Sequence, residues 1–265
     1  MTWLDVCIDV SHNNGAVDWP NLDPSIALVF LKATQGSGFV DPMFLSNKSG
    51  ALAKGLMVIP YHFLDGSDPD GQVENFGQFL AVGQPYALDW EGRASQTAAA
   101  GDAESIGVAL AAKFNRLPVG YWGIPGSSPA NPTPIMQGWT QWIPRYPVQD
   151  ARDFSNIPAD KLSLVSAPFW QYTAWGRVTG VAGNVDRSVW NGTLDELQAW
   201  FGTAVAPAPA VALAPAMPVS DPISKILAAA DFREAVRVFQ AANSLTVDGQ
   251  IGPNTLRAIG KEMKP

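Results

Sequence analysis

Short apolar runs alternate with longer helix-like stretches through the first 120 residues, and this alternation most constrains the fold. The segments 42–55, 70–83 and 98–116 contain the helix formers. Continuous apolar strands separated by helices are typical of a parallel sheet covered on both faces. Beyond residue 120 the helical signal fades, so the sequence predicts an α/β fold, an irregular (β/α) TIM-like barrel. The expected strands are 6–10, 27–33, 57–64, 86–89, 117–122, 141–146 and 168–172.

A change in composition divides the chain into three parts. Residues 203–220 are rich in alanine and proline and carry almost no charge, which is typical of a semi-rigid linker. The segment after it contains two helix-like stretches and is short for an independent core. We therefore expect a large domain at 1–202, a linker at 203–220 and a small helical domain at 221–265.

Charge and hydropathy exclude several classes of protein. Residues 1–203 carry 11 basic and 19 acidic side chains, which argues against nucleic acid as a partner because phosphate binding needs clustered Lys and Arg. No apolar run approaches ~18 residues, so no membrane span is expected. The first residues lack the features of a signal peptide, which predicts synthesis in a cytoplasm. The single cysteine, Cys7, is expected to be buried. No extra apolar stripe suggests a partner subunit, so we expect a monomer.

Two carboxylates one residue apart end the fourth expected strand. In the run Tyr86-Ala87-Leu88-Asp89-Trp90-Glu91 a strand would project Asp89 and Glu91 from the same face. Their backbones would lie ~6.6 Å apart, roughly the separation used in acid/base hydrolysis of a glycosidic bond. Like charges at this distance raise one pKa and keep one group protonated. A solvated Asp and Glu that merely end a strand would give the same pattern.

Other polar residues also stand at the ends of expected strands. In a barrel of this kind the carboxyl ends of the strands meet on one rim, where functional residues lie. Asp9 could instead cap the following turn, and Asp186 could simply pair with Arg187. The residues that the rule brings to the rim include Asp9, Lys32, Thr34, Tyr61, His62, Tyr121, Trp122, Gln171 and Tyr172.

The sequence argues against other catalytic chemistries. His12 and His62 are the only histidines, so a His-rich zinc site is not expected. The G-x-S-x-G pattern of serine hydrolases and a glycine-rich phosphate loop are both absent from the sequence. We expect no cofactor and no metal.

Read together, these residues resemble glycoside hydrolase family 25, the Chalaropsis-type lysozymes. The resemblance runs in order from residue 5 to about 200. It is carried by the segments Ile8-Asp9-Val10-Ser11, Phe30-Leu31-Lys32-Ala33-Thr34, Gly38-Phe39-Val40-Asp41-Pro42, Tyr61-His62-Phe63, Leu88-Asp89-Trp90-Glu91, Trp142-Ile143-Pro144-Arg145-Tyr146, Trp170-Gln171-Tyr172-Thr173 and Gly183-Asn184-Val185-Asp186.

The resemblance implies an N-acetylmuramidase that cleaves the β-1,4 bond between N-acetylmuramic acid and N-acetylglucosamine. It implies that Glu91 is the general acid and that Asp89 assists it by orienting the substrate's 2-acetamido group. Asp9 and Asp186 match the other two acids of the cleft. The implied sugar contacts are Tyr61, Trp122, Gln171 and Tyr172. Gln35 and Asn14 stand where many members carry Glu and Gln.

The C-terminal module looks like a three-helix peptidoglycan-binding domain through Phe239-Gln240 and Asp248-Gly249-Gln250-Ile251-Gly252-Pro253. A muramidase joined to such a module without a signal peptide resembles a bacteriophage endolysin. The implied partner is the glycan strand of peptidoglycan. The implied location is the host cytoplasm, followed by the bacterial cell wall after release by a holin.

Two alternatives stay open at this point. The barrel could recognise glycan without cleaving it, although a pure binder has no reason to hold like charges in one cleft. It could also cleave another 2-acetamido polymer such as chitin. The stereochemical outcome is also open, since a backbone separation does not define the distance between the carboxyl groups.

Overall fold

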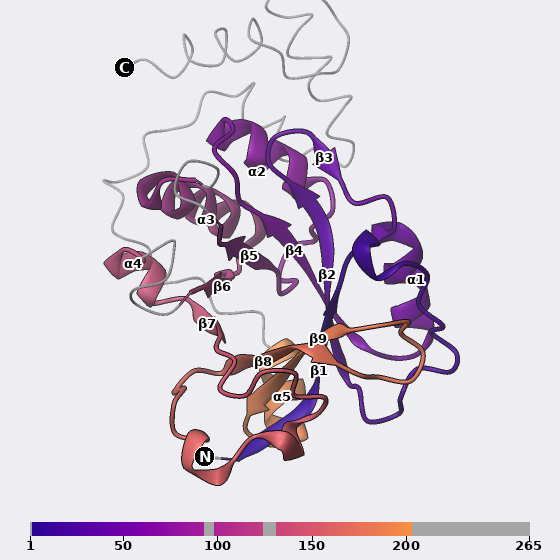
Figure 1. The fold of residues 1–265 in the computed structure, drawn as a ribbon. Coiled ribbons are helices and arrows are strands. Elements are labelled where there is room, and N and C mark those ends of the chain that lie inside the picture. Colours follow the sequence, from indigo (N-terminus) through magenta and orange to yellow (C-terminus); the bar gives the residue numbers. More distant parts are fainter. Residues whose placement is uncertain (1, 93–97, 124–130, 203–265) are drawn as a thin grey trace, which may run out of the picture. The chain divides into compact units, whose positions relative to one another are not determined.

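The computed structural model describes residues 2–92, 98–123 and 131–202. One mixed sheet of nine strands forms the centre of this region, in the order β1-β9-β8-β7-β6-β5-β4-β2-β3. A further pairing of β1 with β2 closes the sheet, and β3 lies outside the ring, so the barrel has eight strands (Figure 1). The expected α/β barrel is confirmed.

Most neighbouring strands of the barrel are parallel, and β9 is the exception. It pairs antiparallel with both β8 and β1 and closes the ring between them. The short β3 is antiparallel to β2. The strands are β1 (Trp3–Val10), β2 (Leu28–Gln35), β3 (Phe39–Val40), β4 (Met57–Phe63), β5 (Ala87–Trp90), β6 (Val119–Trp122), β7 (Thr140–Pro144), β8 (Phe169–Gly176) and β9 (Val185–Asn191).

The helices concentrate in the first half of the barrel, as the sequence predicts. They are α1 (Phe44–Ala53), α2 (Pro69–Gly77), α3 (Ala100–Phe114), α4 (Pro134–Gln137) and α5 (Leu194–Gly202), with single 3-10 turns at His12–Asn14, Phe154–Asn156 and Ala159–Lys161. Local chemistry sets their ends. Asp68 caps α2 by accepting a hydrogen bond from the Gly71 amide, with Pro69 in the first turn. At the end of α3, Asn115 adopts a left-handed backbone conformation with φ 51°.

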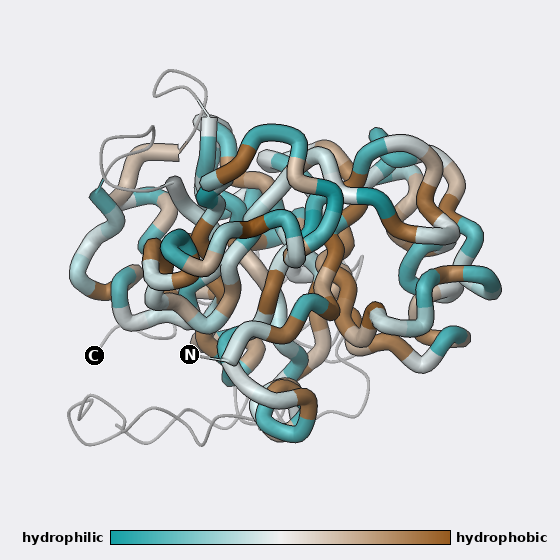
Figure 2. The backbone as a smooth tube through the Cα atoms, turned by 60° about the horizontal axis from the view of Figure 1, so that its bottom comes forward, coloured by the Kyte–Doolittle hydropathy of each residue, from teal (hydrophilic) through white to brown (hydrophobic). Residues whose placement is uncertain are grey.

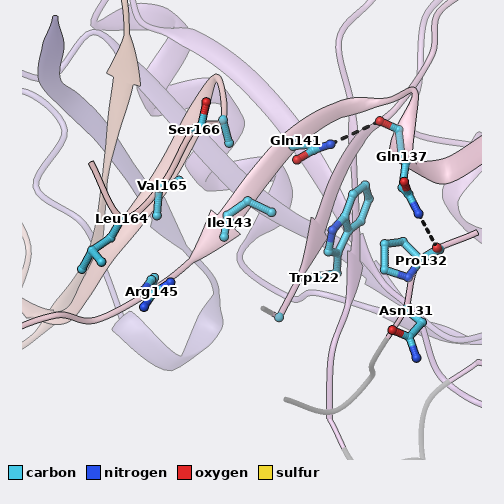
Figure 3. A pocket seen from close by; sticks show the side chains of 12 residues that line it. Trp122, Asn131, Pro132, Gln137, Gln141, Ile143, Arg145, Leu164, Val165 and Ser166 are labelled. Carbon is cyan, nitrogen blue, oxygen red and sulfur yellow. Dashed lines mark hydrogen bonds between the residues drawn. The ribbon is translucent and has the colours of Figure 1, made fainter. Parts of the chain in front are cut away.

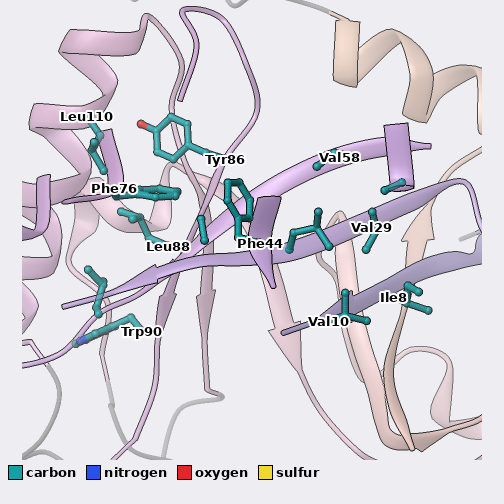
Figure 4. Packing of buried hydrophobic residues seen from close by; sticks show 14 of the residues in the cluster. Ile8, Val10, Val29, Phe44, Val58, Phe76, Tyr86, Leu88, Trp90 and Leu110 are labelled. Atoms are coloured by element: carbon teal, nitrogen blue, oxygen red, sulfur yellow. The ribbon is translucent and has the colours of Figure 1, made fainter. Parts of the chain in front are cut away.

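The outward faces of the strands form one hydrophobic core with the helices. Alternate residues of the strands, such as Ile8, Val29 and Leu88, point outward and pack with Phe44 of α1 and Phe76 of α2 (Figure 4). In Figure 2 hydrophobic and hydrophilic stretches alternate along the backbone, as expected where buried strands are joined by exposed connections. This outer core positions the strands and leaves their inward side chains for a second layer.

A second core fills the inside of the barrel. It contains residues such as Cys7, Leu28, Phe30 and Phe169, and Leu197 of α5 packs against them. The rings of Trp190 and Trp200 contact Phe169 at centroid distances of 4.9 and 5.3 Å, the first tilted by 55° and the second edge-on at 70°. Cys7 is fully buried, as expected, and α5 packs against the inner core.

Several expectations differ from the structure or lie beyond it. The sequence does not predict the strand β9 and the helix α5, because their segments mix polar with apolar residues. No helix among the described residues is long and apolar enough to cross a membrane. The predicted linker at 203–220 and the predicted domain at 221–265 lie outside the described residues.

Candidate active site

Strand alternation brings polar residues to one end of the barrel interior. On β1, Cys7 belongs to the inner core and Asp9 follows it two residues later on the same face. On β5, Ala87 belongs to the inner core, and Asp89 and Glu91 continue its face toward the carboxyl end. The inner core therefore changes into a polar pocket along the strand direction.

This pocket, here called the acid pocket, has a volume of about 280 Å³. Four carboxylic acids line it, Asp9, Asp89, Glu91 and Asp186, which we call the acid cluster. They come from β1, β5 and β9 and from the residue after β5. The remaining lining residues are Ser11, Asn13, Asn14, Lys32, Tyr61, Phe63, Tyr121, Trp142, Tyr146 and Gln171.

Gln171 connects the acid cluster to the aromatic wall of the pocket. Its side chain is 3% exposed, and its Nε2 donates a hydrogen bond of 2.9 Å to Asp9 Oδ2. Its Oε1 accepts hydrogen bonds from the hydroxyls of Tyr121, at 2.8 Å, and Tyr146. Because the amide nitrogen donates and the amide oxygen accepts, these bonds define which way the side-chain amide is oriented. The bond to Asp9 favours the charged form of that carboxyl.

Burial and mutual repulsion disfavour charge on the acid cluster. Burial raises the pKa of Glu91 above its ordinary value, and the nearby Lys32 ammonium opposes this. The pKa of Asp89 is raised well above its ordinary value by burial and then by the charge of Glu91. Burial and the charge of Glu91 raise the pKa of Asp186 to about 6. The pocket therefore favours holding protons on its acids close to neutral pH.

Lys32 is the one Lys or Arg among the described residues that line the acid pocket. Its Nζ donates a hydrogen bond of 2.7 Å to Gln35 Oε1 and lies 4.8 Å from the centroid of the Phe63 ring. Both partners are neutral, so the Lys32 charge acts on the acid cluster and lowers the pKa of Asp89 and Glu91.

One carboxylate oxygen in the pocket lacks a hydrogen-bond partner. Asp89 is 8% exposed, and its Oδ1 is buried without a partner among the described residues. Leaving such an atom unpaired costs roughly 1–3 kcal/mol. The atom is therefore ready to accept a hydrogen bond from an N–H or O–H group of a bound molecule.

Six of the eight predicted site residues line the acid pocket, and two do not. Trp122 lies on the outward face of β6, in the outer core, because its neighbour Tyr121 takes the inward position. Tyr172 is likewise turned outward by the inward position of Gln171. Its hydroxyl donates to the Asp5 carboxylate, 3.1 and 3.2 Å from the two oxygens. Trp122 and Tyr172 therefore do not line the acid pocket, and their role as sugar contacts stays a prediction.

Trp122 lines a different cavity of about 400 Å³ on the outside of the barrel (Figure 3). Ile143, Arg145 and Leu164 share this cavity. A hydrogen bond of 3.2 Å from Gln141 Nε2 to the Gln137 carbonyl crosses its upper wall in that view. The cavity lies on the face of the sheet opposite to that of the acid cluster.

Three aromatic residues of the acid pocket were not predicted as site residues. They are Tyr121, Trp142 and Tyr146. Tyr121 is among the residues expected on the rim, and strand alternation puts it on the same face as Val119 of the inner core. Tyr146 follows the end of β7, and strand periodicity carries no information there.

The structure also decides between the alternative readings of single residues. Asp9 accepts a hydrogen bond from the Gln171 side chain, and Arg187 pairs with Asp5 at 2.8 Å, so Asp186 does not pair with its neighbour. His62 is fully buried with its ring nitrogens bonded to Thr34 and Gln72, and burial lowers its pKa to about 4. His62 is therefore a neutral core residue. No group of three His, Cys, Asp or Glu that could hold a metal ion occurs in the described ranges.

Two family models match the chain. Residues 8–181 match the model for glycosyl hydrolases family 25. Residues 228–259 match the model for a putative peptidoglycan binding domain. The first match begins within β1, extends past the end of β8 and contains three members of the acid cluster, and Asp186 follows it by five residues.

The chain is also similar to proteins of that family. It is 25% identical to Lysozyme M1 of Streptomyces globisporus over 222 residues, covering 72% of this chain and 69% of the relative. The crystal structure of a Streptomyces coelicolor lysozyme shares the fold with a TM-score of 0.57 at 24% identity, covering 74% of this chain and 97% of that one. The catalytic domain of an endolysin from a bacteriophage of Listeria monocytogenes has a TM-score of 0.57 at 18% identity, covering 77% of this chain and 100% of that one.

Proposed function

Because the chain belongs to glycosyl hydrolases family 25 and is therefore a glycosidase, we propose that it is an N-acetylmuramidase. The substrate is the glycan strand of peptidoglycan, and the bond cleaved is the β-1,4 bond from N-acetylmuramic acid to N-acetylglucosamine. The match of residues 228–259 to a peptidoglycan binding domain supports this substrate over chitin.

The acid cluster is the observation that carries the proposal. Four carboxyl groups line one pocket of about 280 Å³, and two of them are Asp89 of β5 and Glu91, the residue directly after that strand. Gathering two buried acids, Asp9 and Asp89, and two half-buried acids in one pocket costs stability, because burial and repulsion oppose their charge. Glycoside hydrolysis uses such a set, since it needs a protonated acid beside groups that stabilise positive charge at the sugar.

In the proposed mechanism Glu91 is the general acid. Burial raises its pKa and so favours its protonated form, and it transfers its proton to the glycosidic oxygen as the bond from that oxygen to the muramic acid C1 breaks. The unpartnered Asp89 Oδ1 accepts a hydrogen bond from the N–H of the 2-acetamido group. That bond stabilises the charged form of Asp89 and leaves the proton on Glu91.

The acetamido carbonyl oxygen is then positioned to attack C1, which gives a cyclic intermediate within the sugar. Glu91, now charged, takes a proton from the water that opens this intermediate. Asp9 and Asp186 lie in the same pocket and stabilise the positive charge of the transition state. Tyr61 lines the pocket beside them as a contact for the sugar. This route retains the configuration at C1.

Digestion of purified peptidoglycan with wild type and with Glu91→Gln tests the proposal. Wild type is expected to release new reducing ends that carry muramic acid, identified by mass spectrometry. Glu91→Gln should lower the rate by at least about 100-fold, because it removes the proton donor. The control is Glu104→Gln, a change on α3, which should leave the rate unchanged.

Other products would contradict parts of the proposal. New reducing ends on glucosamine would assign a different glycosidic bond, and cleavage of chitin but not peptidoglycan would assign a different polymer. Full activity of Glu91→Gln would remove Glu91 from its role. An inverted product anomer, seen by NMR at early times, would contradict attack by the acetamido group.

We further propose that the chain acts as a bacteriophage endolysin. It would be made in the host cytoplasm and reach the wall after release by a holin. The shared fold with a Listeria phage endolysin domain supports this role. Expression in a bacterium with a matching wall should cause lysis only when a holin is expressed with it. Lysis without a holin would contradict release by that route.

A further inference from the structure

A second cavity lies on the same rim as the acid pocket. It has a volume of about 420 Å³ and is here called the rim cavity. Its residues follow the carboxyl ends of β1, β2 and β4, which are neighbours in the barrel. They are His12, Gln35, Ser37, Gly38, Phe39, Asp65 and Ser67.

The rim cavity adjoins the acid pocket through Lys32. The Lys32 ammonium lines the acid pocket and donates to Gln35 Oε1, which belongs to the rim cavity. It also lies 4.8 Å from the centroid of Phe63 in the acid pocket and 5.9 Å from that of Phe39 in the rim cavity. A linear chain of sugars that leaves the acid pocket on this side therefore meets the rim cavity next.

Phe39 presents an exposed ring that its surroundings hold in place. Its side chain is 40% exposed, although it belongs to β3 and pairs with Gln35. The His12 ring lies 5.7 Å from it, and His12 is held by two hydrogen bonds, of 3.0 and 2.7 Å, to the buried Asp41 carboxylate. A fixed ring on the rim loses little freedom when a ligand packs on it.

The polar groups around Phe39 supply donors and acceptors for hydroxyl and amide groups. Gln35 accepts from Lys32 through its oxygen, so its Nε2 can donate. Ser67 Oγ accepts from the Ser37 amide at 2.9 Å, so its hydroxyl hydrogen can be donated. Asp65 accepts from the Ser67 amide at 2.8 Å through one oxygen. An aromatic face flanked by such groups suits a sugar ring, which has C–H faces and hydroxyl edges.

We propose that the rim cavity is a further subsite for the glycan strand, in which one N-acetylated hexopyranose packs its ring face on Phe39. The proposal rests on the proposed function, because the sugar must belong to a strand cleaved in the acid pocket. Its role is to increase affinity for longer strands without taking part in the chemistry.

Glycan fragments of two to five disaccharide repeats test the subsite. With Phe39→Ala, kcat/KM on the longest fragment should fall roughly three- to tenfold, mainly through KM, because an aromatic contact is lost. The shortest fragment that wild type cleaves should be cleaved at an unchanged rate. Phe39→Trp should restore the rate on long fragments. The matched control is Leu45→Ala, a 67% exposed apolar residue on α1, which should change neither rate.

The remaining outcomes would contradict the proposed subsite and the proposed function separately. If Phe39→Ala lowers the rate equally on all fragments, or on none, the rim cavity is not a subsite, while cleavage by wild type keeps the proposed function. If wild type cleaves no fragment of any length, the proposed function fails and the subsite fails with it. Equal midpoint temperatures of thermal unfolding for wild type and the variants would show that the fold is intact in each comparison.

Discussion

At the scale of single residues, the acid pocket depends on groups that oppose each other. Burial disfavours charge on the acid cluster, while Lys32 and the Gln171 amide favour it. Such opposition lets similar carboxyl groups hold different protonation states, as acid catalysis requires. This arrangement lowers the stability of the folded state, because polar groups are buried where apolar residues would pack.

Gln171 acts in this arrangement as a positioning residue, since its three side-chain bonds go to the protein. Gln171→Leu would leave Asp9 Oδ2 and two tyrosine hydroxyls without this partner, and should destabilise the protein by about 1–3 kcal/mol. Urea unfolding measures this loss. The pH profile of kcat should also change, because the lost bond raises the pKa of Asp9. The control Gln141→Leu, on the outside of the barrel, should leave the profile unchanged; an unchanged profile in Gln171→Leu would contradict positioning.

Asp186 is expected to lower stability at neutral pH. Its folded-state pKa of about 6 lies above its ordinary value of 3.8, so the folded state binds the proton more tightly than the unfolded state. The stabilisation from that proton is complete below the ordinary value and is lost as the pH rises through 6. Asp186→Asn should therefore stabilise the protein by about 1–3 kcal/mol at pH 8 relative to wild type.

Urea unfolding at two pH values checks this sign. The gain of Asp186→Asn at pH 8 should shrink at pH 4, and the variant should lose activity on peptidoglycan. Asp160→Asn is the control, because Asp160 is exposed and pairs with the adjacent Lys161. An equal gain at both pH values would show that the effect does not come from titration.

At the scale of elements, a single strand serves two cores and the site. In β1 and β5 the outward side chains belong to the outer core, the first inward side chains fill the barrel, and the last inward side chain lines the acid pocket. The outward side chains Trp170 and Tyr172 of β8 belong to a separate cluster. The expected strands and the first three helices could be predicted because periodicity is a local property. The strand β9 could not, since its mixed segment becomes a strand only by pairing with β1 and β8.

The helix α5 is expected to stabilise the barrel through its contacts with the inner core. Leu197 is fully buried there, and Leu197→Ala should cost about 2–5 kcal/mol of unfolding free energy. Leu194→Ala on the same helix is the matched control, because Leu194 is 40% exposed, and it should cost less than about 1 kcal/mol. Equal losses for the two variants would mean that α5 contributes through its helicity and not through the inner core.

At the scale of the whole molecule, cleavage and wall attachment are proposed to reside in different parts of the chain. We propose that residues 1–202 form the catalytic domain, 203–220 the linker and 221–265 the wall-binding domain. The match at 228–259 lies within the last part. The net charge of −7 opposes approach to a polyanionic wall, so a separate attachment would raise the local concentration of enzyme.

Removing residues 221–265 should separate the two activities. On intact cell walls the rate should fall by roughly 10-fold or more, because the attachment is lost. On soluble glycan fragments the rate should stay the same, because the acid pocket is complete within residues 9–186. Co-sedimentation with walls measures the loss of binding. Equal loss on soluble fragments would contradict the division into domains.

The sequence by itself determined the properties that depend on neighbours in the chain. It placed Asp89 and Glu91 on one face of a strand, predicted the barrel from alternating strands and helices, and located the change of composition at 203–220. Tertiary structure decided which side chains meet. The pairing of β9 with β1 and β8 placed Asp186 opposite Asp9, and the inward turn of Tyr121 and Gln171 displaced Trp122 and Tyr172 from the pocket. The pairing of β1 with β9 joins residues more than 100 positions apart in the chain, so no local pattern reports the register that brings Asp186 to Asp9.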